Sequence, residues 1–105
     1  MNLMGPDMPR AIVNGTVVAE SDEYEIVEGN VYFPPESIKR ELFKESTLHS
    51  TCPWKGVASY YTLAVNGIEL PDIAWYYPRP AEAASNIQDH VAFYPEVMIE
   101  MDEAS

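Results

Sequence analysis

Hydrophobic residues along the chain form short runs that alternate with polar residues and end at glycine or proline. Alternation with a period of two is typical of half-buried β-strands. Asn14-Gly15, Glu28-Gly29-Asn30 and Asn66-Gly67 each separate two such runs, and these residues suit tight turns with positive φ. The sequence therefore predicts three hairpins. Their paired runs are Ala11–Val13 with Thr16–Ala19, Tyr24–Val27 with Val31–Phe33, and Ala58–Val65 with Ile68–Leu70.

Further strands are predicted over Ile73–Tyr77, Val91–Tyr94 and Val97–Met101, because β-prone residues there are bounded by prolines. Two segments favour short helices: Ser37–Phe43, which follows Pro34-Pro35 and turns Ile38, Leu42 and Phe43 inward, and Ala81–Ile87. The predicted fold is mainly β. It is a small single-domain, twisted or barrel-like antiparallel sheet with one or two short helices.

A length of 105 residues fits one domain. Residues 1–10 are predicted to be a flexible leader, residues 11–101 a single β-rich domain, and residues 102–105 an acidic tail. The chain has one cysteine, shows no signal-peptide pattern and has no apolar run of membrane-spanning length. These features predict a cytoplasmic protein.

The chain carries 17 acidic and 6 basic residues, a net charge of −11. Binding to phosphate backbones needs clustered lysine and arginine, so neither nucleic acid nor an anionic membrane is an expected partner. The acids gather in Glu20–Glu28 and Glu96–Glu103, which are interpreted as solvated faces. Because no EF-hand ligand spacing occurs, no calcium site is predicted, and no cofactor is expected.

The segment Leu48–Thr62 concentrates the chemically versatile side chains. Cys52 is a candidate nucleophile, because Lys55, His49 or His90 would lower its pKa if close. The alternative is a small buried residue beside Pro53. The candidates for catalysis are thus Cys52 and His90. His49, Cys52 and His90 lack the paired spacing of zinc ligands, so no metal site is predicted.

Lys55-Gly56 is either a simple turn or the anion-binding part of a pocket, supported by Arg79 from the Pro78-Arg79-Pro80 corner. Neighbouring aromatic residues such as Tyr60 and Tyr61 must face opposite sides of a strand. One side then builds the core, and the other offers aromatic faces to a planar ligand or a protein partner. The predicted ligand-binding residues are Trp54, Lys55, Tyr61, Trp75, Tyr77 and Arg79.

Five separated motifs point to a family. They are Val31-Tyr32-Phe33-Pro34, Thr-Cys-Pro-Trp-Lys-Gly at 51–56, Ala-Ser-Tyr-Tyr at 58–61, Ala-Trp-Tyr-Tyr-Pro at 74–78 and His-Val-Ala-Phe-Tyr at 90–94. From about Ala11 to Met101, the chain closely resembles the family catalogued as domain of unknown function 427. The resemblance implies a small β-rich domain with a short helix before the final strands. It implies no mechanism.

That family also carries a nucleotidyltransferase-like label, which the residues disfavour. Nucleotidyl transfer commonly uses two aspartates one residue apart after a Gly-Ser turn, to hold divalent metal. Neither Asp-x-Asp nor Gly-Ser occurs here. A phosphate-binding loop requires Gly-Lys-Ser/Thr, whereas this chain has Lys55-Gly56.

Two functions are compatible with these patterns. The first is a small-molecule binding domain with an aromatic cleft, for a ligand that can be anionic. In its enzymatic version, Cys52 or a histidine acts on the ligand. The second is a non-catalytic protein–protein interaction module that presents an aromatic and acidic surface or a sheet edge. A concave pocket enclosing Lys55 and Arg79 would favour the first. An outward-pointing Lys55 on a flat aromatic face would favour the second.

Overall fold

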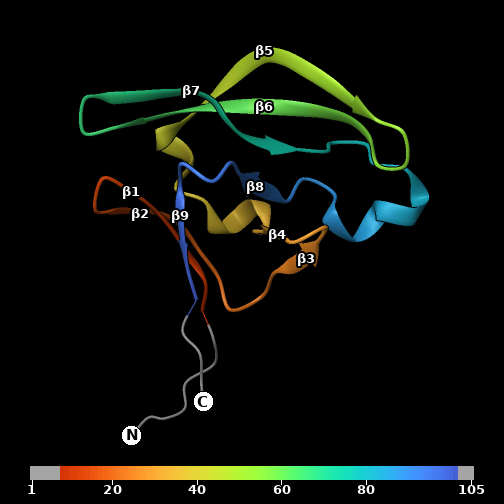
Figure 1. The fold of residues 1–105 in the computed structure, drawn as a ribbon, viewed down its shortest axis with the longest axis horizontal. Helices are drawn as coiled ribbons and strands as arrows, with labels where there is room; N and C mark the ends of the chain where they lie inside the picture. Colours follow the sequence, from red (N-terminus) through yellow and green to blue (C-terminus); the bar gives the residue numbers. More distant parts are fainter. Residues whose placement is uncertain (1–7, 102–105) are drawn as a thin grey trace, which may run out of the picture.

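The structure, a computed structural model, describes residues 8–101 as a mainly β fold of three antiparallel sheets (Figure 1). The sheets have the strand orders β2-β1-β9, β3-β4 and β5-β6-β7-β8. The strands are β1 (Arg10–Val13), β2 (Thr16–Glu20), β3 (Glu25–Val27), β4 (Asn30–Tyr32), β5 (Phe43–Cys52), β6 (Gly56–Val65), β7 (Ile68–Tyr76), β8 (Val91–Phe93) and β9 (Met98–Glu100).

All three predicted hairpins are confirmed. β1 pairs with β2, β3 with β4, and β6 with β7, each in antiparallel register. The turn dipeptides Asn14-Gly15, Glu28-Gly29 and Asn66-Gly67 have φ values of 51° and 78°, 54° and 80°, and 51° and 80°. Positive φ at both central residues matches the right-handed twist of the flanking strands. The turn chemistry therefore explains these parts of the fold.

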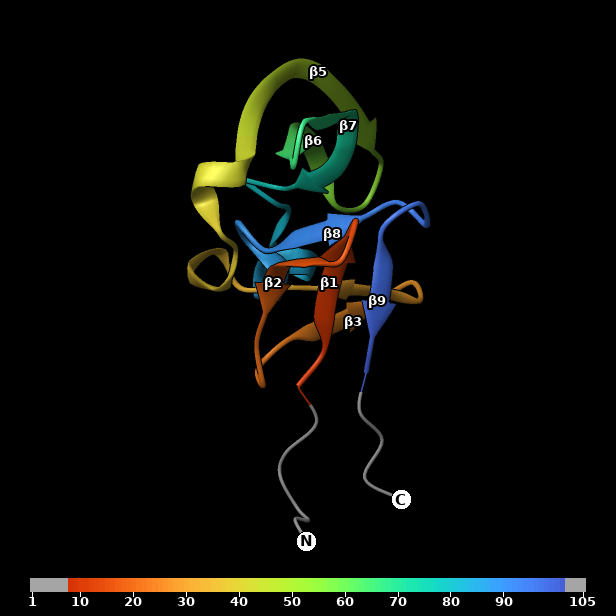
Figure 2. The same cartoon turned by 90° about the vertical axis from the view of Figure 1, so that its left-hand side faces the viewer.

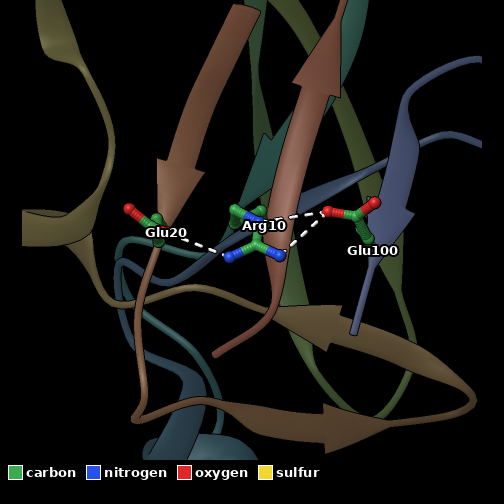
Figure 3. Close-up of polar contacts among 3 residues, drawn as sticks. All are labelled: Arg10, Glu20 and Glu100. Atoms are coloured by element: carbon green, nitrogen blue, oxygen red, sulfur yellow. Dashed lines mark hydrogen bonds and ion pairs between the residues drawn. The ribbon is translucent and has the colours of Figure 1, made fainter. Parts of the chain in front are cut away.

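β1 is the central strand of its sheet, between β2 and the last strand, β9. The Arg10 side chain crosses this sheet and links all three strands (Figure 3). Its guanidinium lies 3.4 Å from the Glu20 carboxylate and donates hydrogen bonds of 3.2 and 2.9 Å to Glu100. The two ends of the described chain are thereby held side by side.

The largest sheet is formed by β5, β6, β7 and β8 (Figure 1). β5 arches over β6 and β7 (Figure 2), and its register with β6 shifts between Glu45 and His49. A second irregularity lies between Tyr61 and Leu63. Such bulges bend a strand and increase its twist. The sheet remains open with β5 and β8 at its edges, so the fold is a twisted sheet and not a closed barrel.

Two apolar clusters form the core. The first contains Phe33, Tyr61, Leu63 and Phe93, and the second contains Tyr32, Tyr60, Tyr77 and Ile87. The predicted alternation along β6 thus places Tyr60 and Tyr61 in different clusters. Edge-to-face packing stabilises the first cluster, with the rings of Phe33 and Phe93 5.8 Å apart.

The β3–β4 hairpin is tied to the large sheet just beyond Tyr32. The backbones of Phe33 and Val91 exchange two hydrogen bonds of 2.8 Å. This bridge brings the hairpin turn at Glu28 toward the large sheet, which matters for the site described below.

The segments predicted as short helices are 3-10 turns. They are η1 (Pro35–Ser37), η2 (Arg40–Leu42) and η3 (Glu82–Ile87), which contains a kink at Ala84. No side-chain cap supports any of the three turns, and Phe43 already begins β5, so the predicted helix over Ser37–Phe43 has no room to extend. Ile38 and Phe43 are nevertheless buried, as the pattern predicted.

The first strand begins one residue before the predicted start of the β-rich domain. Arg10 opens β1, and the residue before it, Pro9, is fully buried. Residues 1–7 of the predicted leader and the predicted tail, residues 102–105, lie outside the described residues. Within residues 8–101, no helix is long and apolar enough to cross a membrane.

Candidate functional site

Lys55 is a buried cation at the turn between β5 and β6. Its side chain is 6% exposed, and its ammonium forms an ion pair with Glu28, whose side chain is 51% exposed. The Lys55 Nζ atom also lies 5.0 Å from the centre of the Trp54 ring and 5.7 Å from that of Tyr77. A buried charge must be paired or solvated, and here a carboxylate and two aromatic faces take that role.

The residues around this ammonium are called the Lys55 cluster. They come from separate strands and turns: Glu28 from the β3–β4 turn, Tyr32 from β4, Cys52 from the end of β5, and Tyr77 from just after β7. The Trp75 indole extends the cluster by donating a 3.1 Å hydrogen bond to the Tyr32 hydroxyl. The members of the Lys55 cluster are Glu28, Tyr32, Cys52, Trp54, Lys55, Trp75 and Tyr77.

The ion pair of Lys55 and Glu28 is charged at neutral pH. Hydrogen bonds from Lys55 and from the Trp54 indole, the latter of 3.1 Å, lower the pKa of Glu28. Burial is the largest single influence and by itself would lower the pKa of Lys55, but the hydrogen bond to Glu28, together with charge interactions with Tyr77, Tyr32 and Cys52, raises that pKa. Lys55 is therefore protonated and bound to a carboxylate, which suits neither a general base nor a nucleophile.

Cys52 is half-buried at the end of β5. Burial by itself would raise the pKa of its thiol, but the backbone N–H groups of Trp54 and Lys55, with the Lys55 charge, shift that pKa below its ordinary value. Among the described residues, neither histidine forms a hydrogen bond with Cys52. The imidazole Nδ1 of His49 donates to the Thr47 carbonyl at 3.1 Å, and that of His90 to the Gln88 carbonyl at 2.9 Å.

The structure separates the predicted ligand-binding residues into three places. Trp54, Lys55, Trp75 and Tyr77 belong to the Lys55 cluster. Tyr61 is on the opposite face of the sheet: its ring stacks on Tyr76 at 4.5 Å, and its hydroxyl accepts a 3.4 Å hydrogen bond from Arg40. Arg79 lies in a cleft beside the cluster.

The cleft at Arg79 has a volume of about 570 Å³. It lies where β5 and β6 meet the segment that follows β7. Lys55 is not among its lining residues, so the cleft does not enclose Lys55 and Arg79 together. The residues that line this Arg79 cleft are His49, Gly56, Val57, Ser59, Pro78, Arg79, Pro80 and Ala81.

The cleft and the Lys55 cluster are in contact through the backbone of Lys55 and Gly56. The carbonyl of Lys55 accepts a 2.9 Å hydrogen bond from the Ala81 amide. Gly56 has φ of +114°, and a Cβ atom there would be 3.4 Å from the Arg79 carbonyl oxygen. The positive φ requires glycine, and the segment carrying Arg79 packs directly against the turn anchored by Lys55.

The basic residues of the chain differ in their partners. Arg10, Lys44 and Lys55 form ion pairs with carboxylates, and Arg40 donates to the Tyr61 hydroxyl. Within residues 8–101, Lys39 and Arg79 have no ion pair with an acidic side chain. Of these two, Arg79 lines the cleft just described.

A second cleft, of about 500 Å³, is lined by four acidic residues and by no lysine or arginine. It contains the other predicted catalytic candidate, His90, which is far from Cys52 in the topology of the large sheet. No three His, Cys, Asp or Glu side chains in the described part of the chain are arranged to hold a metal ion. The lining residues are Asp22, Glu23, Tyr24, Glu25, Pro34, Pro35, Glu36 and His90.

Sequence reasoning missed Glu28, which it interpreted as part of a solvated acidic run. One signal was present: Glu28 occupies the turn position that Asn14 and Asn66 hold in the other hairpins, where a side chain must accept positive φ. The sequence analysis also did not identify Val57 and Ser59 as cleft residues, because their pattern is that of any strand. Nothing in the local pattern marks them.

Comparison with known proteins gives a family. A family model described as a domain of unknown function, DUF427, matches residues 6–104, nearly the whole chain. No curated protein matches significantly. The match covers every strand of the fold, together with the Lys55 cluster and the Arg79 cleft. The chain therefore belongs to the DUF427 family, whose function is unknown.

Proposed function

We propose that this protein is a small-molecule binding domain that takes an anionic ligand in the Arg79 cleft. The supporting observation is a guanidinium without a carboxylate partner among the described residues, in a cleft whose lining includes no acidic side chain. The volume of about 570 Å³ is typical of ligand sites. The planar guanidinium fork matches carboxylate and phosphate groups.

The absence of acids from this lining is notable in a chain with 17 of them. An exposed arginine elsewhere on such a surface is readily neutralised by a neighbouring carboxylate, as Arg10 is by Glu20 and Glu100. Arg79 has no such ion pair among the described residues, so its charge can pair with an anionic ligand. The same acidic surroundings repel anions that lack a specific contact, so binding depends on Arg79.

The Lys55 cluster supports the cleft without lining it. Since its ammonium is paired with Glu28, Lys55 is assigned as a positioning residue, and the role of anion-binding group passes to Arg79. The cluster fixes the turn whose carbonyl binds Ala81 and whose Gly56 contacts the Arg79 backbone. Tyr32, Tyr77 and Trp75 of the cluster pack in or against the core, and no aromatic residue of the cluster is among the lining residues of the cleft.

The test is an amide-resolved NMR titration of the full chain with ADP, glucose 6-phosphate and benzoate, each at millimolar concentration. At least one of these anions should shift the amides of Val57, Arg79 and Ala81. The Arg79→Gln variant should lose the response. Lys39→Gln is the matched control, because Lys39 also lacks an ion pair in the described residues but is not a lining residue of the cleft. If no anion shifts these amides, or the Arg79→Gln variant responds unchanged, the proposal fails.

An interaction module that pairs through a sheet edge is the alternative. β5 is a ten-residue edge strand with mostly exposed side chains. However, its register is broken between Glu45 and His49, and Lys44 and Glu45 carry charge on this edge. Bulges and charged residues are the means by which edge strands avoid pairing with other chains. We therefore prefer the ligand-binding function.

A further inference from the structure

The charge of the Arg79 cleft limits the charge of its ligand. Arg79 is the single lysine or arginine among the eight lining residues, and the whole chain carries −11. Proteins that hold di- or triphosphates surround them with several cationic or metal charges and with free backbone amides. One guanidinium in an acidic protein balances one negative charge.

The backbone amides at the cleft also argue against a phosphate cradle. The Ala81 N–H already donates to the Lys55 carbonyl at 2.9 Å. Gly56 is paired with Cys52 at the end of the β5–β6 ladder. The Nδ1 atom of His49 is likewise used, by the Thr47 carbonyl. The lining then offers an anion the Arg79 guanidinium, the Nε2 atom of His49 and the Ser59 hydroxyl, and Arg79 is the group among these with a permanent charge.

The remaining lining is mostly apolar. Val57 has a side chain on the cleft and is 50% exposed, although valine is usually buried. Pro78, Pro80 and Ala81 have no hydrogen-bonding side-chain group. A sugar or other polyhydroxyl body would lose hydrogen bonds to water on this surface, whereas an apolar body would cover Val57 and the two prolines.

We infer that the ligand of the Arg79 cleft is a small monocarboxylic acid with an apolar body, and not a nucleotide or a phosphorylated compound. The carboxylate pairs with the Arg79 guanidinium, and the body lies on Val57, Pro78 and Pro80. This inference rests on the proposed function and adds the class of ligand. It concerns binding only and invokes no reaction step.

Four probes of related shape test the inference: benzoate, phenyl phosphate, benzyl alcohol and acetate. Each is titrated into the full chain, and the dissociation constant is read from the amide shifts of Val57 and Ala81. Benzoate has both the single negative charge and the ring, so it should bind about tenfold or more tightly than each of the others. Benzyl alcohol lacks the charge, acetate lacks the ring, and phenyl phosphate adds charge.

Two substitutions separate the contribution of the charged contact to benzoate binding from that of the apolar contact. Arg79→Gln should weaken benzoate about tenfold or more and leave benzyl alcohol unchanged, because only the charge-assisted contact is removed. Val57→Asn should weaken benzoate several-fold and leave acetate unchanged. Lys39→Gln should bind all four probes as the unaltered chain does. Far-ultraviolet circular dichroism and the amide spectrum confirm that each variant is folded.

The outcomes distinguish this inference from the proposed function. If phenyl phosphate binds more tightly than benzoate and depends on Arg79, the monocarboxylate inference is overturned while anion binding in the cleft stands. If benzyl alcohol binds as tightly as benzoate, both the inference and the role of Arg79 are overturned. If no probe shifts the cleft amides and ADP and glucose 6-phosphate also fail, the proposed function falls as well.

Discussion

Glu28 is the residue whose conformation and contacts are most closely linked. It has φ of +54° at a turn position where the other two predicted hairpins have asparagine. Non-glycine residues with positive φ are uncommon, and asparagine is the best tolerated of them. The ion pair with Lys55 and the hydrogen bond from Trp54 offset this backbone cost. The turn therefore holds a carboxylate under the buried ammonium.

The two partners of this ion pair should respond unequally to substitution. Glu28→Asn keeps a residue suited to the turn but leaves a buried ammonium without a carboxylate, so it should lower the free energy of unfolding. Lys55→Met fills the same space without charge, and the half-exposed Glu28 returns to water. Its effect should stay within about 1 kcal/mol of zero. Urea denaturation measures both, and a larger loss for Lys55→Met would contradict the assignment.

The pair should also make stability depend on acid. The pKa of Glu28 is lower in the folded chain than its ordinary value of 4.5. Its contribution is therefore fully present above pH 4.5 and is lost as the pH falls through the lower, folded pKa. The stability difference between the unaltered chain and Glu28→Asn should shrink as the pH is lowered from 6 into that range. A constant difference across this range would show that the pair is not the cause.

At the scale of elements, the segment after β7 depends on Gly56. An alanine there would be strained by the φ of +114°, and any backbone movement that relieves the strain would reach the segment after β7, because the Cβ atom would touch the Arg79 carbonyl oxygen at 3.4 Å. Gly56→Ala should destabilise the fold by about 1 kcal/mol or more and weaken benzoate binding. Gly67→Ala is the matched control: its φ is +80°, but a Cβ there meets no atom within 4 Å. The Gly67→Ala variant should lose stability but bind benzoate as the unaltered chain does. Urea denaturation measures the stability, and a benzoate titration measures the binding.

The elements that local chemistry determines were predictable. Asn-Gly and Glu-Gly dipeptides specify hairpins within a few residues, so the three hairpins follow from the sequence. The long strand β5 was not predicted, and β7 was predicted as two strands, Ile68–Leu70 and Ile73–Tyr77. The helical segments reduced to 3-10 turns because no cap supports them and Phe43 already belongs to a long strand. Helix propensity is weak over six or seven residues, and tertiary pairing overrides it.

The candidate site was predictable only in part, because its geometry depends on contacts distant in sequence. Trp54 and Lys55 are adjacent, and their proximity to Tyr77 follows from strand order. Glu28 reaches Lys55 across 27 positions, and no local pattern encodes that contact. Tyr61 and Tyr77 lie on opposite faces of the sheet. Alternation along one strand assigns its side chains to two faces, but it does not say which face of a neighbouring strand they share.

At the scale of the whole molecule, the net charge of −11 destabilises the folded chain through self-repulsion. Added salt should reduce this repulsion. The urea midpoint should rise as sodium chloride is increased from about 0.01 M to 0.15 M, where the screening length falls from about 30 Å to 8 Å. A fall in the midpoint would show that ion pairs outweigh the repulsion.

Arg10 stabilises the folded chain by attraction between opposite charges, because it pairs with two carboxylates across the β2-β1-β9 sheet. Arg10→Gln should lower the free energy of unfolding by about 1 kcal/mol at low salt, less at high salt. Its urea midpoint should therefore rise more steeply with salt than that of the unaltered chain. Lys44→Gln, which removes the exposed pair with Glu69, should have a smaller effect.

The position of β1 between β2 and β9 has a consequence for biosynthesis. The β1–β2 hairpin can form as soon as its residues leave the ribosome, but one edge of β1 then waits for Met98–Glu100, which are translated some eighty residues later. Throughout that interval the nascent chain exposes an unpaired strand edge, which invites pairing with other chains. Completion of this sheet therefore follows the synthesis of β9 and cannot precede it.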